Sequence, residues 1–278
     1  MKYSITLASF RKLEPLEETL PKLAKQGYNA VEMYGEPADF DISKLKDVFS
    51  TNALPVCGIT GMWGSASNHG WKRLLSSSNR DLVRTTMSYV QDCIKMCNSL
   101  DGKELNVCLF TDELKGFDRT HAVLSDSEKD RFRKSSVPIL SELCSFASDN
   151  GVQLALEPLN RYSTPYCCSA KDAIDIVREV NSESLGILLD TFHMNIEEDS
   201  FEYPILATGT ALKHTHFADN NRKMPGFAHI DFSTIVRSLH DIGYDGYISF
   251  EPNIADKNYE HAVNTGLEFI KKKVEALH

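Results

Sequence analysis

The sequence lacks the features that mark several large classes of protein. No stretch approaches the roughly 20 apolar residues that a membrane-spanning helix needs. The first residues are expected to form a strand, since they lack the apolar stretch and cleavage site of a signal peptide. The seven cysteines are scattered without a Cys-x-x-Cys spacing, which disfavours a disulfide framework and a thiolate zinc site. We therefore expect a cytoplasmic protein that has no membrane partner.

Basic residues are fewer than acidic ones. The chain has 30 Lys and Arg against 39 Asp and Glu, a net charge of −9, and no cluster of basic residues. An acidic surface repels a phosphate backbone, so nucleic acid is not an expected partner. Neither Gly-x-Gly-x-x-Gly nor Gly-x-x-x-x-Gly-Lys-Ser/Thr occurs. These are the two common nucleotide-binding motifs, so the sequence gives no indication of a nucleotide-binding loop.

Eight short apolar runs alternate with helical patterns along the whole chain. Helical spacing is clear in Leu16, Leu20 and Leu23 near one end, and in Val263 and Leu267 near the other. The expected strands are Tyr3 to Ser9, Ala30 to Tyr34, Pro55 to Thr60, Leu105 to Phe110, Gln153 to Glu157, Leu185 to Asp190, Leu212 to Phe217 and Tyr247 to Glu251.

Strands this apolar have no face suited to water, so they indicate a parallel sheet that is covered by helices. At 278 residues the α/β pattern predicts a single (β/α)8 TIM barrel domain over residues 1–278. A doubly wound open sheet is the alternative. The loop over residues 61–70, which contains Gly, Ser and Trp, is a candidate lid.

One phrase occurs twice: an apolar strand that ends in Glu-Pro, first at Glu157 and again at Glu251. Proline has no backbone N–H to donate to a neighbouring strand, and its ring holds the preceding glutamate in an extended conformation. Two more apolar strands end at Asp190 and at His216. The carboxyl ends of barrel strands converge on one face, so we expect these four side chains to point toward a common centre.

Three carboxylates and one imidazole predict a site for one divalent metal ion. This donor set suits Mn²⁺, Mg²⁺ or Co²⁺ better than a structural zinc ion. His193, which follows Asp190 by three residues, is expected on the loop above the metal, where it would hold a substrate oxygen or cap a helix. Arg222 is expected to reach over the same pocket, whereas His214 is expected to pack beside the site and support it.

Aromatic residues supply candidate walls for a sugar ring. Trp63 and Trp71 follow the third expected strand, and Phe10 and Tyr34 lie at the ends of earlier strands. Such residues are more often core than binding surface, so this assignment is the weaker hypothesis.

The strand-end motifs resemble those of the ketose 3-epimerases, the D-tagatose and D-psicose 3-epimerase group of the xylose isomerase-like barrels. The matching strings are Glu157-Pro-Leu-Asn-Arg, Leu-Asp190-Thr-Phe-His193-Met-Asn, His216 with a following Asn-Arg222, and Glu251-Pro. The resemblance is close in the second half of the chain and rests on the strand–helix pattern in the first half.

This resemblance implies a metal ion, usually Mn²⁺, held by Glu157, Asp190, His216 and Glu251. It also implies that His193 and Arg222 contact the substrate, and that the chain forms a homo-oligomer. At one position the chain departs from the pattern, because Ser163 stands where the family commonly has a glutamate that contacts the sugar. The resemblance therefore leaves the identity of the sugar open.

The implied activity is that of an isomerase of carbohydrate metabolism which inverts C3 of a ketose. Glu157 and Glu251 would face opposite sides of C3, one removing the proton and the other returning it, while the metal stabilises an enediolate. Related activities remain alternatives: a hydroxypyruvate isomerase, an inosose dehydratase, or a pentulose-phosphate epimerase whose phosphate would lie near Arg222 and Lys223.

Two alternatives come from other classes. An endonuclease IV-like DNA repair enzyme needs further histidine ligands at the ends of the third and fourth strands, where the sequence has none, although His69 and His229 occur in loops. A barrel that binds sugar without turning it over is the other alternative. It would not need so many potential ligands.

Overall fold

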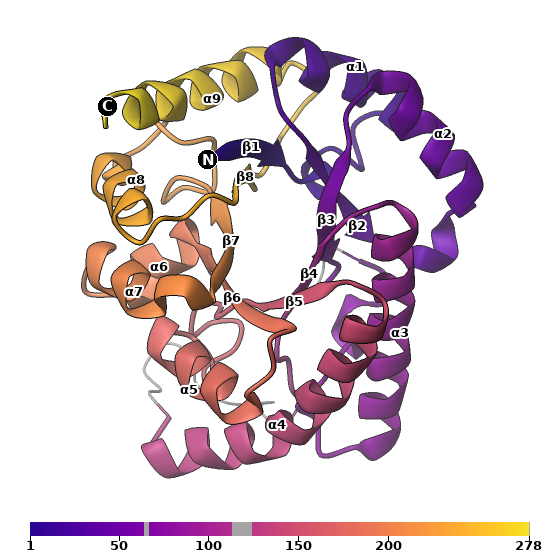
Figure 1. Ribbon diagram of the computed structural model, residues 1–278, viewed down its shortest axis with the longest axis vertical. Coiled ribbons are helices and arrows are strands. Elements are labelled where there is room, and N and C mark those ends of the chain that lie inside the picture. The colour runs from indigo at the N-terminus through magenta and orange to yellow at the C-terminus, as the bar shows by residue number, and fades with distance from the viewer. Residues whose placement is uncertain (64–66, 113–123, 278) are drawn as a thin grey trace.

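The computed structural model describes residues 1–63, 67–112 and 124–277, so residues 64–66 of the candidate lid lie outside the described part. Eight strands form one parallel sheet in the order β1-β8-β7-β6-β5-β4-β3-β2, with helices around it (Figure 1). A parallel bridge between Thr6 and Glu32 joins the first strand to the second. The sheet thus closes on itself almost completely, and the predicted (β/α)8 barrel is confirmed.

All eight predicted strands are present, and each is followed along the chain by at least one helix. The strands are β1 (Lys2–Ile5), β2 (Val31–Gly35), β3 (Val56–Gly61), β4 (Glu104–Val107), β5 (Gln153–Leu156), β6 (Leu185–Asp190), β7 (Leu212–Phe217) and β8 (Tyr247–Phe250). The α-helices are α1 (Leu16–Gln26), α2 (Ile42–Asn52), α3 (Arg80–Ser99), α4 (Asp126–Asp149), α5 (Ala170–Val180), α6 (Thr191–Glu197), α7 (Glu202–Thr208), α8 (Phe232–Asp241) and α9 (Glu260–Glu275).

Two strands end at least three residues before their predicted ends, while β5 and β8 each stop one residue early. β1 stops at Ile5 because Leu7–Ser9 form a 3-10 turn, in which the Thr6 hydroxyl accepts a hydrogen bond from Ala8 N. β4 stops at Val107, and the chain beyond it leaves the ladder, with Phe110 O accepting from Ser76 N at 3.0 Å. Both apolar runs continue into segments that are buried in part, with Leu7, Cys108 and Leu109 almost inaccessible to solvent.

The helices pack their apolar faces onto the outside of the barrel. Leu20 and Leu23 of α1 are fully buried, as are Val263 and Leu267 of α9. Helix α1 ends at Gly27, whose φ of 90° is a left-handed conformation that glycine adopts without strain. No helix in the described part of the chain has both the length and the apolar character that crossing a membrane requires.

The inside of the barrel is unusually polar. TIM barrels are generally filled by branched apolar side chains, whereas here Glu32, Thr60, His214, His216 and Ser249 are all buried. Buried polar groups are costly unless they are hydrogen-bonded. This interior therefore has to form a connected network, and that network lies directly beneath the functional site.

Candidate metal centre and substrate cavity

The four predicted ligands come together at the carboxyl ends of four neighbouring strands. Glu157 follows β5, Asp190 ends β6, His216 lies in β7 and Glu251 follows β8. Each offers a ligand atom, and these four atoms lie within 4.8 Å of one another. Both glutamates are fixed by their backbones: Glu157 N donates to Val107 O at 3.0 Å, and Glu251 N to Phe217 O at 3.1 Å.

His216 provides the test of whether this group suits a cation. Its ring is fully buried, with Nε2 lying 3.2 Å from Glu32 Oε2 and Nδ1 lying 3.3 Å from Glu251 Oε2. Nδ1 is also 3.9 Å from Glu157 Oε1, yet neither carboxylate has the geometry of a hydrogen-bond partner for it. A buried nitrogen that lacks a partner and faces carboxylates has the environment of a metal ligand, and Glu32 would set its tautomer. The residues present therefore fit a divalent ion.

The two glutamates have different surroundings. Burial raises the pKa of Glu157 to about 8, while its Oε2 accepts a hydrogen bond from Asn106 Nδ2 at 2.7 Å. Burial acts in the same direction on Glu251, but Arg222 and His216 outweigh it and lower the pKa of Glu251 to about 2. Two acids of the same type thus differ in pKa because their neighbours differ.

Arg222 spans two of the candidate ligands. Its guanidinium donates to the carboxylates of Asp190 and Glu251, and it lines the same cavity as Glu251. Its backbone is left-handed, with a φ of 58°, and Arg222 N donates to Asp219 O at 2.8 Å. The prediction that Arg222 reaches the pocket matches this placement, while the pairing with two carboxylates was not predicted.

Asp219 holds the loop that presents Arg222. It is completely buried, and its carboxylate accepts from the backbone N–H groups of Gly226 and Ala228 at 3.0 Å and of Ile230 at 3.1 Å. The sequence analysis missed this residue, because Asp219 followed by two asparagines reads as an ordinary polar turn. The sequence signal that was available is its position two residues after the buried end of β7.

We expect Asp219→Asn to lower the free energy of unfolding by about 2–3 kcal/mol, because hydrogen bonds to a charged acceptor contribute about 1.5–3 kcal/mol. In the asparagine variant, an NH2 group also replaces one carboxylate oxygen, so that a donor faces the backbone N–H groups of the loop. Urea denaturation measures this loss. Asp231→Asn is the matched control, since Asp231 caps α8 at the surface and asparagine caps a helix equally well. Equal losses in the two variants would show that Asp219 has no special role.

His193 lies in helix α6 rather than on the predicted loop, because Asp190 Oδ1 accepts from Phe192 N at 2.8 Å and starts the helix at once. His193 Nδ1 accepts from Asn160 N at 3.1 Å, which assigns the proton to Nε2. Nε2 is 3.7 Å from Asp190 Oδ2 and 4.0 Å from Glu157 Oε1. Burial lowers the pKa of His193 to about 4. The ring is therefore a neutral donor at the edge of the site.

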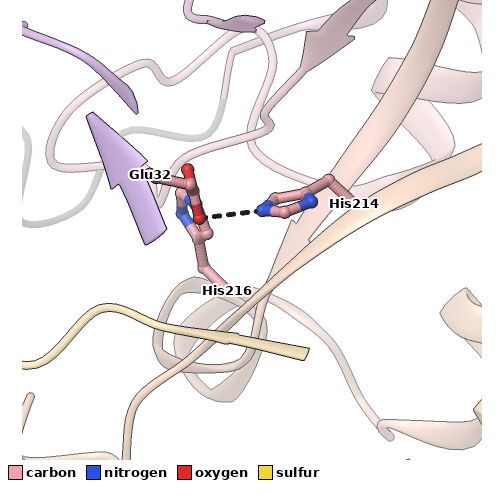
Figure 2. Close-up of side chains that lie close together, drawn as sticks. All are labelled: Glu32, His214 and His216. Carbon is pink, nitrogen blue, oxygen red and sulfur yellow. Dashed lines mark hydrogen bonds and ion pairs between the residues drawn. The ribbon is translucent and has the colours of Figure 1, made fainter. Parts of the chain in front are cut away.

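A second buried group lies beneath the four ligands and shares His216 with them. Glu32 on β2 accepts a hydrogen bond from His214 Nε2 at 2.9 Å, and Figure 2 shows this pair together with His216. Glu32 also accepts from Thr60 Oγ1 at 2.8 Å and from the Ser249 hydroxyl. Burial would raise the pKa of Glu32, but His216 and His214 hold it well below its usual value. Glu32 is thus an anion that is satisfied by four neighbours.

His214 takes the supporting position expected of it. Its Nε2 contacts Glu32, and its Nδ1 lies 2.8 Å from Glu104 Oε2. Burial would lower its pKa, yet the two carboxylates raise the pKa of His214 to about 9. Glu32 itself was missed by the sequence analysis, although a single glutamate inside an otherwise apolar strand was a visible signal.

A cavity of about 800 Å³ opens above the four ligands. Glu157 and Glu251 line its inner end, and the rings of Trp63 and Phe110 stack in its wall at 6.0 Å and 19°. Trp71 also lines it, so two of the four predicted wall residues are there. The other two are not among the described lining residues: Phe10 packs against Tyr259, with ring centres 4.7 Å apart, and Tyr34 against Phe40, at 5.4 Å.

Comparison with known proteins gives consistent matches. The model of the xylose isomerase-like TIM barrel family matches residues 20–273. A D-psicose 3-epimerase of Ruminiclostridium cellulolyticum is 31% identical over 84% of this chain and 76% of its own length. A 3-dehydro-D-guloside 4-epimerase of Escherichia coli is 25% identical over 93% of this chain and 95% of its own.

A solved structure agrees with these matches. The crystal structure of D-psicose 3-epimerase with D-tagatose from Clostridium cellulolyticum superposes with a TM-score of 0.82, at 25% identity, and 99% of both chains is covered. The sequence relatives and the solved structure therefore indicate the same fold over most of the chain.

Proposed function

The chain belongs to the xylose isomerase-like TIM barrel family, among relatives that are ketose 3-epimerases, and from this premise we propose that it inverts C3 of a ketose. It is a sugar-modifying isomerase. One relative is named for inversion at C3 of a 2-ketose, and another for inversion at C4 of a 3-dehydro sugar. In both names the inverted carbon adjoins a ketone, so the shared chemistry is removal and return of the proton next to a carbonyl.

The observation that carries the proposal is the pair of Glu-Pro strand ends. Glu157 and Glu251 line one cavity, come from strands on either side of β6 and β7, and hold carboxylate atoms within 4.8 Å of the same group of ligands. Inversion needs one group that takes the proton from one face of C3 and another that supplies it from the opposite face. Because the two acids are of the same type, either can start the cycle, which suits a reversible reaction.

Glu157, Asp190, His216 and Glu251 would hold one divalent ion, for which Mn²⁺ is our expectation and Mg²⁺ or Co²⁺ the alternatives. A cation held there supplies Lewis-acid stabilisation of the negative charge that develops on the ketone oxygen. The unpartnered Nδ1 of His216 among three carboxylates supports this assignment.

The remaining polar groups would position the sugar. His193 Nε2 faces the inner end of the cavity as a neutral donor, suited to a hydroxyl or carbonyl oxygen of the substrate. The Arg222 guanidinium already contacts Asp190 and Glu251, so it would orient these carboxylates as well as any sugar oxygen that reaches it. We infer that both residues bind substrate.

The alternatives fit the cavity less well. Arg222 is the one cation among the described residues that line it, and two carboxylates already engage Arg222, which leaves no free cation for a sugar phosphate. The additional metals of an endonuclease IV-like enzyme would need more histidines. Within the described chain, His69 and His229 are exposed and belong to neither group of potential ligands.

Product identification tests the proposal. The protein is stripped with a chelator, reloaded with Mn²⁺, and incubated with D-fructose, D-tagatose and D-psicose; the products are separated by chromatography. We expect C3 epimers from the reloaded protein and none from the stripped protein. An aldose product, or turnover only of phosphorylated ketoses, would overturn it.

A further inference from the structure

The lining of the cavity changes character from its inner end to its rim. At the inner end, Glu157 is 5% exposed and lies beside the other potential ligands. At the rim, Trp71 is 66% exposed and Tyr162 is 48% exposed, and both line the same cavity. Exposed large apolar side chains are ordinary when they are scattered, but those that gather around one cavity mark a binding surface. The cavity thus has a charged inner part and an aromatic outer part.

The volume is large for a single free sugar. About 800 Å³ lies in the upper part of the range of roughly 300–1,000 Å³ for pockets that enclose drug-sized ligands. A free pentose or hexose is considerably smaller than such ligands. A monosaccharide with its ketone at the metal centre would therefore leave the outer part of the cavity unfilled.

The outer part is suited to a neutral ring. Its walls are Trp63, Phe110 and Leu159, with Trp71 and Tyr162 at the rim. Asp112 is the one charged residue among the described lining residues of this outer part, and its Oδ1 accepts from Ser77 Oγ at 2.6 Å. Flat aromatic faces contact the C–H faces of a sugar, while the hydroxyls stay in water. Next to Tyr162, Ser163 also lines the cavity, with a side chain shorter than the glutamate that the family commonly has there.

We propose that the preferred substrate is a glycosylated ketose, with the ketose unit at the metal centre and a second sugar ring on the aromatic rim lined by Trp71 and Tyr162. The second ring would be attached at O4, O5 or O6, because C1 to C3 must reach the inner end. This inference rests on the proposed function and specifies its substrate. The chemistry remains inversion at C3, with one proton removed and one returned.

Turnover and binding are measured separately, so that the two proposals can fail separately. With Mn²⁺-loaded protein, kcat/KM is compared for D-fructose and for two fructose glycosides, lactulose (linked at O4) and isomaltulose (linked at O6). Binding to the metal-free protein is followed by tryptophan fluorescence, because both tryptophans of the chain line the cavity. We expect at least about tenfold higher kcat/KM and correspondingly tighter binding for one or both glycosides, since each aromatic contact adds to the affinity.

Trp71→Ala and Tyr162→Ala are expected to reduce this preference, measured as the ratio of kcat/KM for glycoside to that for D-fructose, by several-fold each. Tyr203→Ala is the matched control, because Tyr203 is 74% exposed on α7 and is not among the described cavity residues. The control should keep the wild-type ratio.

The outcomes separate clearly. Free ketoses that turn over as well as the glycosides would overturn the inference and leave the proposed function intact. Absence of turnover with every ketose would overturn the proposed function. Without turnover, the inference that the substrate is a glycosylated ketose is overturned as well. Equal binding of D-fructose and the glycosides would show that the rim does not bind a second sugar ring.

Discussion

Replacing Glu251 with glutamine is expected to lower kcat for ketose epimerisation by roughly 10²–10⁴-fold, because the change removes one of two general acid–base groups. Glu157→Gln should have an effect of the same order. Both amides keep an oxygen that can contact a cation, and Glu251 is held by its backbone hydrogen bond to Phe217 O. Initial rates and bound metal are measured on the same preparations.

Isotope exchange makes this prediction sharper. With two bases on opposite faces, each variant should lose the exchange of the C3 proton for one epimer of a ketose pair and retain part of it for the other. The two variants should differ in which epimer is affected. Glu268→Gln is the control, since Glu268 lies on α9 and contacts Lys271 at the surface. Near-normal turnover in a metal-loaded Glu251→Gln protein would contradict the two-base scheme.

Glu32→Gln is the second substitution for which we expect a large effect. Glu32 is 2% exposed and is contacted by two histidines and two hydroxyls. Removing one partner of a buried charged network costs about 3–5 kcal/mol. Since Glu32 also contacts His216 Nε2, metal affinity should fall by about 10–100-fold. Urea denaturation and metal titration measure the two effects.

Glu104→Gln is the matched control for this substitution. Glu104 also contacts His214, at 2.8 Å, but its side chain is 18% exposed and is not part of either group of potential ligands. We expect a smaller loss of stability and unchanged metal affinity. Equal effects of the two substitutions on metal affinity would show that Glu32 does not position His216.

The barrel and the ligand group were predictable because their signals are local. Each strand is a short apolar run, and Glu157, Asp190 and Glu251 each come at the end of such a run. Once the runs are taken as parallel strands of a barrel, their ends must meet. The proline that follows both Glu157 and Glu251 distinguishes these two strand ends from other apolar runs.

Of the supporting residues, His214 was predicted, whereas Glu32 and Asp219 were not, because the sequence does not show which groups they contact. Glu32 on β2 contacts His214 and His216 on β7 and Ser249 on β8, pairings that only barrel closure creates. Asp219 contacts backbone N–H groups of a loop that has no regular pattern. Isolated polar residues of this kind are common in sequences, and only their burial distinguishes them.

The most direct test of the central claim is deuterium exchange followed by NMR. Stripped and Mn²⁺-loaded protein are incubated in D₂O with D-fructose, D-tagatose and their C3 epimers. The account predicts deuterium at C3 together with epimer formation, in the metal-loaded sample alone. Deuterium at C1 would indicate an aldose–ketose isomerase instead, and equal exchange without metal would contradict the role assigned to Glu157, Asp190, His216 and Glu251.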